Sequence, residues 1–588
     1  MDMAVDTVGG NVDEWLCQFE SVLTDQDWTA LESLFLEDCH WRDLLAYTWH
    51  ITTHSGRENV VTAIRETMHK PVTSFKCVGR PYLVPRGGRD EVLECLFEFR
   101  SDVGKCRGVI RLCEDPDNPG VHKAWTILTS LDQIIGFEET IGADRPKGDI
   151  YSRNFSGPNW LDRRNIAIAY EDREPEVLIV GGGQAGLSIA ARLTQLGVDA
   201  LIVDQGVRVG DNWRNRYHAL VLHNQVHVNH LPYLPFPPNW PTYIPKDKLA
   251  AWFEFYTEVM ELNFWTGTEF VGGEYNEDKS CWTVDLKRSD GTLRKVRPSH
   301  LVMATSVSGI PNIPTIPTLE EFSGEIMHSS EFTSADSYKD RRVLVVGTGT
   351  SAHDIAQDLH SNGAKVCLLQ RSPTSVVNVE PSAQLPYTLY DEGHSLDDTD
   401  LIATATPLQA LKSAHELITK QSTHLDKDLL DGLTKVGFKI DREDRTGWQF
   451  KYMTRGGGYY FNVGCSDLIV NGEVGLIQSD DIENFIADGI KLKNGETQTF
   501  DTIVLATGFK GMDAFVKQRL GPEVAARVGP IWGFDETDQE LRNMWVRTPQ
   551  PGLWFIAGSF AQCRIYSKYL SLQVKACIEG LIPKNKHK

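Results

Sequence analysis

Two glycine-rich turns constrain the fold of this chain more than any other feature. Each turn follows a short apolar strand and opens an amphipathic helix, in VLIVGGGQAGLSIAARLTQ from residue 177 and RRVLVVGTGTSAHDIAQDL from residue 341. Each helix leads into a second apolar strand, which makes each unit a β-α-β mononucleotide-binding fold. The sequence therefore predicts an α/β protein with two Rossmann-type dinucleotide-binding domains.

The first turn has the residues that an FAD site needs. Gly183 lets a pyrophosphate approach the backbone, and Gly186 lets the helix pack closely on the strand. The free N–H groups of the helix N-terminus attract phosphate. Asp204 ends the second strand, where an acid binds the ribose. The residues expected to contact FAD are Gly181, Gly183, Gln184, Ala185, Gly186, Asp204 and Gln205.

The second turn has a different partner at the end of its second strand. There the chain reads Gln370-Arg371-Ser372, without an acid. An arginine at this place pairs with a 2′-phosphate, so we expect NADPH rather than NADH. The alternative is that Arg371 is only a solvated charge at a strand end. The residues expected to contact NADPH are Gly347, Gly349, Thr350, Ser351, Arg371 and Ser372.

Composition restricts the partners. The chain has 588 residues, with 80 acidic and 59 Lys or Arg side chains, giving a net charge of −21. This charge repels phosphate backbones and anionic lipids, so we expect neither nucleic acid nor membrane partners. The 11 cysteines include no Cys-x-x-Cys, and no leader or membrane span is visible, which predicts reduced thiols and a cytoplasmic protein. We expect no metal site, and a homodimer is the protein partner we consider.

Residues 10–145 have a different pattern of apolar residues. Helical spacing of apolar residues gives way to alternation, as in VLECLFEFR, and DPDNPG marks a turn between two further strands. Helical spacing at residues 15–23 and 28–35 predicts two helices, and Ser55 and Glu58 fit the start of a third. This α+β pattern resembles the NTF2-like (SnoaL-like) domain. A pocket lined by His40, Trp41 and Asp43 is one hypothesis, and an ordinary core is the favoured reading.

The polar residues 146–175 are interpreted as a linker crossed by few contacts. Beyond it, the segment FSGEIMHSSEF places Phe322, Gly324, His328 and Phe332 in the pattern Phe-x-Gly-x-x-x-His-x-x-x-Phe/Tyr. With the two turns, this pattern resembles the class B flavoprotein monooxygenases, which include flavin-containing, Baeyer–Villiger and plant indole-3-pyruvate monooxygenases. Phe332 stands where the stricter Baeyer–Villiger enzymes usually have Trp.

The resemblance covers about residues 172–588 and implies further site residues. Ala304-Thr305-Ser306 looks like a degenerate copy of the family's Ala-Thr-Gly strand, and residues 385–450 depart from the compact plant enzymes. The implied domains are FAD-binding at 176–335, NADPH-binding with an insertion at 336–500, and an FAD-binding return at 501–588. The implied cofactor-binding residues in addition to the two turns are Trp213, His223, Ala506, Thr507, Gly508, Gly558 and Gln573.

The resemblance also implies a reaction. NADPH would reduce FAD, and O2 would add at flavin C4a, so that a C4a-(hydro)peroxyflavin oxygenates a small organic substrate at N or S or attacks a carbonyl. The catalytic candidates are His223 and Asn224, which would contact the peroxide, and His328. A flavin disulfide reductase would need a redox cysteine pair that is missing here. The alternatives that stay open are an NADPH oxidase releasing H2O2 and a non-enzymatic NTF2-like adaptor with a vestigial flavin part.

Overall fold

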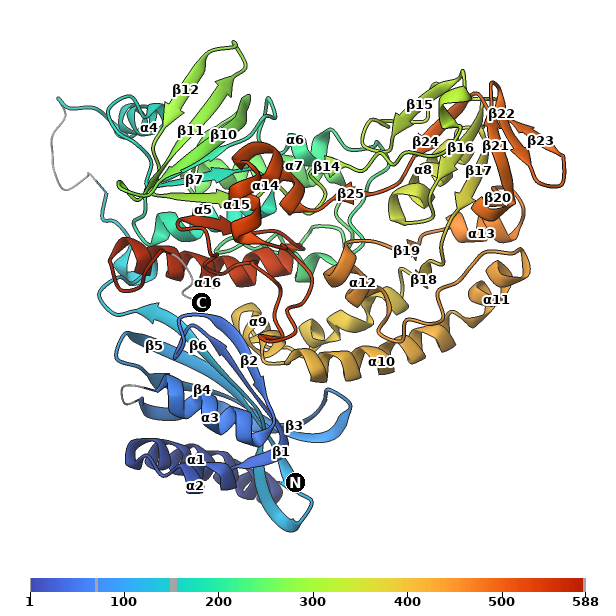
Figure 1. Ribbon diagram of the computed structural model, residues 1–588. Helices are drawn as coiled ribbons and strands as arrows, with labels where there is room; N and C mark the ends of the chain where they lie inside the picture. Colours follow the sequence, from blue (N-terminus) through green and yellow to red (C-terminus); the bar gives the residue numbers. More distant parts are fainter. Residues whose placement is uncertain (1, 69–71, 149–155, 585–588) are drawn as a thin grey trace.

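A computed structural model describes residues 2–68, 72–148 and 156–584. Its parts are an N-terminal α+β unit, drawn in blue in Figure 1, and two α/β units, of which one lies directly above the blue unit and the other to its upper right. The C-terminal helix α16 (Phe560–Ile578) runs between the N-terminal unit and the first α/β unit (Figure 1).

The N-terminal unit is a six-stranded sheet in the order β2-β1-β6-β5-β4-β3, with its helices gathered on one face (Figure 1). Its resemblance to NTF2-like domains stays a prediction. Its elements are α1 (Asp2–Asp25), α2 (Trp28–Ser33), β1 (Phe35–Leu44), β2 (Ile51–Ser55), α3 (Arg57–Thr67), β3 (Thr73–Arg86), β4 (Arg89–Arg100), β5 (Gly104–Asp115) and β6 (Asn118–Ile134).

The expected cap of the third helix is wrong by one residue. Ser55 is the last residue of β2, and α3 has Gly56 as its N-cap, without a side-chain hydrogen bond. Gly56 has a φ of +85°, a conformation that L side chains rarely adopt. The turn from strand to helix therefore needs glycine at residue 56. The N-cap lies one residue after the serine that the sequence pattern favoured.

The two α/β units have the same parallel sheet order around their glycine-rich turns, which confirms the predicted fold class. The first sheet is β26-β13-β7-β8-β9 and the second is β15-β24-β16-β17-β20. The first contains β7 (Val177–Val180), β8 (Ala200–Val203), β9 (Asn263–Trp265), β13 (His300–Met303) and β26 (Leu553–Phe555). The second contains β15 (Glu325–His328), β16 (Arg342–Val346), β17 (Lys365–Gln370), β20 (Gly475–Gln478) and β24 (Thr502–Leu505).

This topology moves two expected domain boundaries. β15 precedes residue 336 and β24 follows residue 500, yet both pair within the second sheet. Each unit also has a small antiparallel sheet. The first is β10 (Thr268–Asn276), β11 (Cys281–Arg288) and β12 (Leu293–Val296), and the second is β21 (Ile482–Ile486), β22 (Gly489–Leu492) and β23 (Thr497–Thr499).

Part of the expected linker is ordered. The helix α4 (Trp160–Ala169) starts with a capping box between Asn159 and Asp162. It packs at the edge of the first sheet, where the indole N–H of Trp265 donates to the Ile168 carbonyl at 2.7 Å. Residues 149–155 of the linker lie outside the described residues.

The insertion of the second unit forms a helical layer that reaches back to the N-terminal unit. Its long helix α10 runs from the N-terminal unit toward the second α/β unit (Figure 1). The elements of this layer are β18 (Ser375–Asn378), η5 (Ser382–Asp391), α9 (Leu396–Thr404), α10 (Leu408–Leu425), α11 (Lys427–Lys435), α12 (Gly447–Arg455) and β19 (Tyr459–Asn462).

The expectation of few contacts across the linker is wrong. The guanidinium of Arg42 binds both carboxylate oxygens of Glu540 at 2.7 Å, and Ser130 is 3.0 Å from the Tyr569 hydroxyl on α16. Residues from the N-terminal unit, from α16 and from α9 belong to one hydrophobic core cluster. A polar side chain on a strand gives no signal in sequence that it faces another domain. The polar composition of the linker therefore wrongly predicted two units with few contacts.

None of the helices in the described ranges has the length and apolar character that a membrane span requires.

Candidate functional site

The first glycine-rich turn is shaped for close approach. Gly181 has a φ of +107°, and a Cβ there would lie 2.4 Å from the Ala304 carbonyl oxygen. A Cβ on Gly186 would lie 1.9 Å from the Gly181 oxygen. The helix α5 (Gln184–Gln195) begins directly after the turn, with Gly183 as its N-cap. Only glycine fits at residues 181 and 186, as the fingerprint predicts.

Asp204 lies where the ribose acid is expected, and it also holds the turns. Its carboxylate accepts from the backbone N–H groups of Gly182 and Gly206, each at 2.7 Å. Gln205 beside it is exposed.

The N-terminus of α16 completes this cradle. Gly558 has a φ of +122°, and its carbonyl accepts from the side chain of Gln184 at 3.3 Å, which brings the starts of α5 and α16 together. Trp213 packs on Phe560, and its indole N–H is buried without a hydrogen-bond partner among the described residues. The α5 N-terminus, which has no side-chain cap, and an unpartnered buried donor fit a bound dinucleotide such as FAD.

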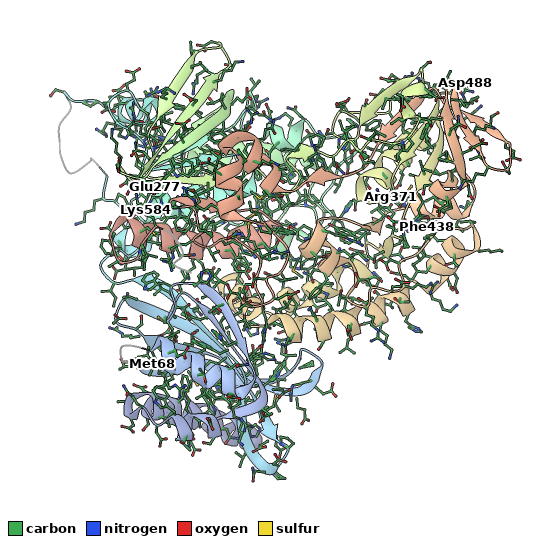
Figure 2. All side chains as sticks on the ribbon, viewed as in Figure 1. Met68, Glu277, Arg371, Phe438, Asp488 and Lys584 are labelled. Carbon is green, nitrogen blue, oxygen red and sulfur yellow. The ribbon has the colours of Figure 1, made fainter. Side chains whose placement is uncertain are left out.

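The second turn repeats this geometry. Gly347 has a φ of +123°, and a Cβ there would lie 2.5 Å from the Ala506 oxygen. The helix α8 (Thr350–Ser361) follows, and the Thr350 hydroxyl donates to the Tyr459 carbonyl at 3.2 Å. Arg371 is exposed at the end of β17 (Figure 2), and its side chain binds no described residue. A free guanidinium at this place fits a nucleotide 2′-phosphate.

The Phe-x-Gly-x-x-x-His segment connects the two units. Phe322 and Phe332 are buried, and a Cβ on Gly324 would lie 2.5 Å from the Phe322 ring and 2.8 Å from the Asp501 oxygen. His328 is buried at the end of β15. Its Nε2 lies 3.1 Å from the Gly508 carbonyl oxygen, and its Nδ1 accepts from the Ser330 backbone N–H. Both ring nitrogens of His328 are therefore occupied by the chain.

The Ala-Thr-Gly strand end and its degenerate copy have the same backbone. Gly508 has a φ of +81°, and Ser306 has a φ of +68°. The Thr507 hydroxyl donates to the Asn312 carbonyl at 2.6 Å, which ties this strand end to the crossing segment. The turn at residue 306 is therefore retained although serine is less suited to it than glycine.

His223 and Asn224 face the insertion. The Asn224 amide donates to the Tyr387 hydroxyl at 3.0 Å, and Gln384 donates to the His223 carbonyl at 2.9 Å. The His223 ring contacts the Phe461 ring edge to face, with centroids 5.7 Å apart. The structure thus brings together two sequence-predicted residues and a set of insertion aromatics that the sequence did not reveal. The aromatic cluster consists of Tyr387, Trp448, Tyr459 and Phe461.

The departure of residues 385–450 from the plant enzymes is the one sequence signal for Tyr387 and Trp448, and Tyr459 and Phe461 lie beyond that range. His328 makes none of its contacts with His223 or Asn224; its partners are Ser330, Gly508 and Phe509.

The structure gives Gln573 a different role from the predicted contact with the cofactor. Its side-chain amide donates to the carbonyls of Trp545 and Tyr569, and its oxygen accepts from the Arg547 N–H. The amide is fully used in holding the 545–547 loop on α16, which withdraws the side chain from cofactor binding. A glutamine on a helix carries no sequence signal that separates these two roles.

The hypothetical N-terminal pocket is a satisfied core. Asp43 accepts from the hydroxyls of Thr129 and Thr48, and the Trp41 indole donates to Thr129 at 2.9 Å. His40 lies 2.8 Å from the Ser55 hydroxyl. Burial raises the pKa of Asp43, against these hydrogen bonds. This arrangement fits the ordinary core that the sequence analysis favoured over a pocket.

Comparison with known proteins decides the family. The chain is 30% identical over 340 residues to a probable indole-3-pyruvate monooxygenase, YUCCA10 of Arabidopsis thaliana, covering 57% of this chain and 82% of that protein. It is 29% identical over 391 residues to the rice (Oryza sativa subsp. japonica) indole-3-pyruvate monooxygenase YUCCA1, covering 66% and 86%. The chain belongs to the class B flavoprotein monooxygenases.

Two further comparisons concern the fold. Residues 178–395 match the family model described as pyridine nucleotide-disulphide oxidoreductase. A cyclohexanone monooxygenase structure shares the fold with a TM-score of 0.51 at 16% identity, over 69% of this chain and 87% of that chain. The OTEMO complex with FAD and NADP has a TM-score of 0.50 at 16% identity, over 70% and 86%.

Class B membership fixes the cofactors and the chemistry in outline. The protein is a flavin-dependent monooxygenase that uses FAD and NADPH, and it acts with O2 on a small molecule. All 11 cysteines are free. No group of three metal-binding side chains occurs among the described residues.

Proposed function

We propose that this protein oxygenates a small, largely apolar organic substrate through a C4a-(hydro)peroxyflavin, with His223 and Asn224 at the oxygen-transfer site. FAD would be held by the 181–186 turn, Asp204 and the start of α16. NADPH would be held by the 347–352 turn and Arg371. The observation that carries the proposal is the position of the 223–224 segment between these two cofactor cradles.

The contacts on both sides of this segment support that position. On the FAD side, Arg564 of α16 donates to the carbonyls of Val228 and His230 at 2.8 and 2.9 Å. On the NADPH side, Phe461 contacts His223, and Tyr459 beside it accepts from Thr350 at the start of α8. A substrate at Asn224 would therefore lie within reach of both nucleotides.

The aromatic cluster supports an apolar substrate and a dry site. The rings of Trp448 and Phe461 meet edge to face at 4.6 Å, and Tyr387 packs beside Trp448. Trp448 also lines a cavity of about 530 Å³ next to α10, which is bordered by charged side chains such as Asp441 and Arg445 and is separate from the proposed site. Aromatic walls exclude water, which protects a reactive oxygen-transferring group from hydrolysis.

His328 has a positioning role in this proposal. Its neutral ring joins β15 to the Gly508 turn, because the Nε2–H donates to a carbonyl. Burial lowers the pKa of His328, so it stays neutral at pH 7. It would therefore set the geometry between the FAD and NADPH units without exchanging a proton with substrate.

Stopped-flow spectroscopy tests the proposal. The FAD-loaded protein is reduced with NADPH without oxygen and then mixed with aerated buffer. We expect a transient flavin–oxygen adduct spectrum before oxidised flavin returns, and product formation with a panel of amines, sulfides, ketones and 2-oxo acids. Direct return to oxidised flavin with stoichiometric H2O2, at saturating NADP⁺ and with every substrate, would instead make the protein an NADPH oxidase.

A further inference from the structure

Polar contacts, several of them buried, connect the N-terminal unit to α9 and η5, and η5 in turn contacts Asn224. The connection begins at the C-terminal end of α9, where backbone carbonyls lack helical partners. Arg111 of β5 donates to the carbonyls of Ile402 and Ala405 at 3.1 and 3.0 Å. Arg42 of β1 donates to the Thr404 carbonyl at 2.6 Å. Two cations of the N-terminal unit therefore satisfy the last turn of α9.

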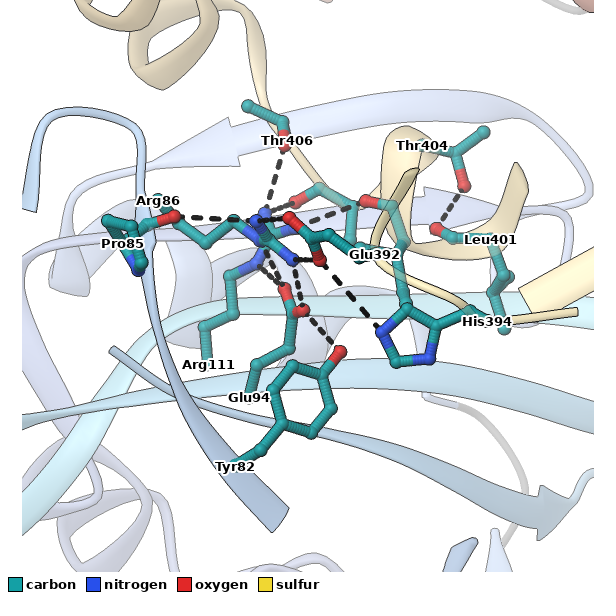
Figure 3. A network of polar contacts seen from close by, with 12 residues as sticks. Tyr82, Pro85, Arg86, Glu94, Arg111, Glu392, His394, Leu401, Thr404 and Thr406 are labelled. Carbon is teal, nitrogen blue, oxygen red and sulfur yellow. Dashed lines mark hydrogen bonds and ion pairs between the residues drawn. The ribbon is translucent and has the colours of Figure 1, made fainter. Parts of the chain in front are cut away.

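A second contact from the N-terminal unit reaches the end of η5. Arg86 of β3 donates to both carboxylate oxygens of Glu392, the C-cap residue of η5, at 2.8 and 2.6 Å. Figure 3 shows Arg86 and Arg111 converging on the buried Glu94. Burial acts to raise the pKa of Glu94, but the two guanidiniums outweigh it and hold the pKa at about 2. Glu94 is thus a fixed anion that orients both arginines.

From α9 the contacts continue to η5 and α16. Asp400 of α9 is buried and accepts from Arg564 of α16 through two hydrogen bonds of 2.7 Å. The same carboxylate accepts from the Tyr390 hydroxyl on η5 at 2.8 Å. Asp400 therefore fixes η5 relative to the helix whose start belongs to the FAD cradle.

Tyr387 lies one turn earlier on η5 and receives the Asn224 amide hydrogen on its hydroxyl oxygen. Its own hydroxyl hydrogen has no acceptor among the described residues. Burial raises the pKa of Tyr387 to about 12, so the hydroxyl is protonated at neutral pH. Tyr387 is half-buried, so its hydroxyl hydrogen is open to a partner that the chain itself does not supply.

We propose that the Tyr387 hydroxyl hydrogen-bonds the substrate at the oxygen-transfer site, and that the N-terminal unit is a part of this site because Arg111, Arg42 and Arg86 hold η5 in place. The proposal rests on the function proposed above. It requires of the substrate a hydrogen-bond acceptor, such as a carbonyl, carboxylate, amine or ether oxygen, next to an apolar body. Specificity then depends on an insertion and a domain that lie outside the two nucleotide-binding units.

The test of Tyr387 uses the full-length FAD-loaded protein and a substrate found in the panel. Tyr387→Phe is expected to lower kcat/KM about five- to tenfold, the effect of one lost hydrogen bond. H2O2 release per NADPH should rise, while FAD content and the anaerobic rate of flavin reduction stay unchanged. Tyr275→Phe, on β10 away from the site, is the control. A wild-type kcat/KM and H2O2 yield in Tyr387→Phe would overturn the assignment.

The test of the N-terminal unit needs no substrate. Arg111→Lys keeps the charge near Glu94 but loses the planar fork that reaches α9. We expect amide hydrogen exchange at residues 382–392 to become about ten times faster, as loss of one charge-assisted hydrogen bond produces. Tyr390→Phe, a milder change, should act in the same direction. Arg57→Lys, whose ion pair with Glu37 stays within the N-terminal unit, should leave exchange at 382–392 unchanged.

Unchanged exchange at 382–392 in both Arg111→Lys and Tyr390→Phe would overturn the role of the N-terminal unit. Failure of the proposed function is seen separately, since the wild-type protein would then release all its reducing equivalents as H2O2. The exchange measurement decides about the N-terminal unit in either case.

Discussion

At the scale of single residues, the two glycine-rich turns have the same steric constraint. Gly181 packs against the Ala304 carbonyl and Gly347 against the Ala506 carbonyl, and both glycines have positive φ. A Cβ atom at these positions would lie 2.4 and 2.5 Å from the carbonyl oxygens. Each glycine meets backbone, which cannot move aside like a flexible side chain. The same substitution at the two positions therefore separates the roles of the two units.

Gly181→Ala is expected to give a protein with little bound FAD. Gly347→Ala should stay yellow but lose NADPH-driven flavin reduction, since only the second turn is deformed. The left-handed conformation costs an alanine about 1–2 kcal/mol before the steric contact is counted. Flavin absorbance of the purified proteins and anaerobic bleaching by NADPH measure the two effects. A colourless Gly347→Ala protein would contradict the separation.

Arg371→Ala should raise the KM for NADPH about 10- to 100-fold and change the KM for NADH little. The guanidinium is free in the structure, so its loss disturbs no other contact, and a charge-assisted hydrogen bond contributes about 1.5–3 kcal/mol. Steady-state NADPH and NADH oxidation by the wild-type and variant proteins compares the two coenzymes. Equal effects on both would move the 2′-phosphate site elsewhere.

At the scale of elements, the crossing segment 322–332 acts as a joint between the two units. His328→Ala removes the bond from β15 to the Gly508 turn but leaves both glycine-rich turns unchanged. We expect FAD to be retained and the rate of flavin reduction by NADPH to fall about tenfold, as one lost buried hydrogen bond with its desolvated acceptor allows. Stopped-flow absorbance under anaerobic conditions measures this rate. An unchanged rate would make His328 a fold residue only.

The helix α8 has a built-in sensitivity to acid. His353 stacks on Tyr460 with centroids 3.9 Å apart, and burial lowers its pKa to about 4. The unfolded chain, with a pKa near 6.5, binds the proton first, so stability falls as the pH decreases from about 6.5 toward 4. His353→Phe keeps a stacked ring and should lose less stability over this range. Urea midpoints at pH 7 and pH 5 make the comparison, and equal losses in both proteins would contradict it.

At the scale of the whole molecule, the N-terminal unit is built into the enzyme. Buried arginines bind α9 and the loop that holds Glu540, and Ala410 of α10 packs on Trp125 and its neighbours in a separate small cluster. Deleting residues 1–148 would expose these apolar faces and leave the carboxylates of Glu540 and Asp398 without their cations. Each Å² of apolar surface that becomes exposed to water costs about 25 cal/mol, so the deletion destabilises the remaining units.

The truncated protein is therefore expected to lose solubility and to retain less FAD than the full chain. Refolding yield and flavin content of the two proteins measure this. Full FAD occupancy in a monomeric truncated protein would show that the interface contributes little, and would agree with a simple linker at residues 146–175.

The sequence by itself determined the nucleotide-binding units, because strand, glycine turn, helix and strand-end residue are all local in the chain. Gly181, Gly347, Arg371 and the 322–332 segment lie where the spacing predicted. Only the tertiary structure decided which residues line the site proposed between the two glycine-rich turns. Tyr387 meets Asn224 across 163 positions of sequence, and Arg111 meets α9 across almost 300. Such contacts depend on how whole elements pack, and an arginine on a strand or a tyrosine in an insertion looks the same in sequence whether it faces water or another domain.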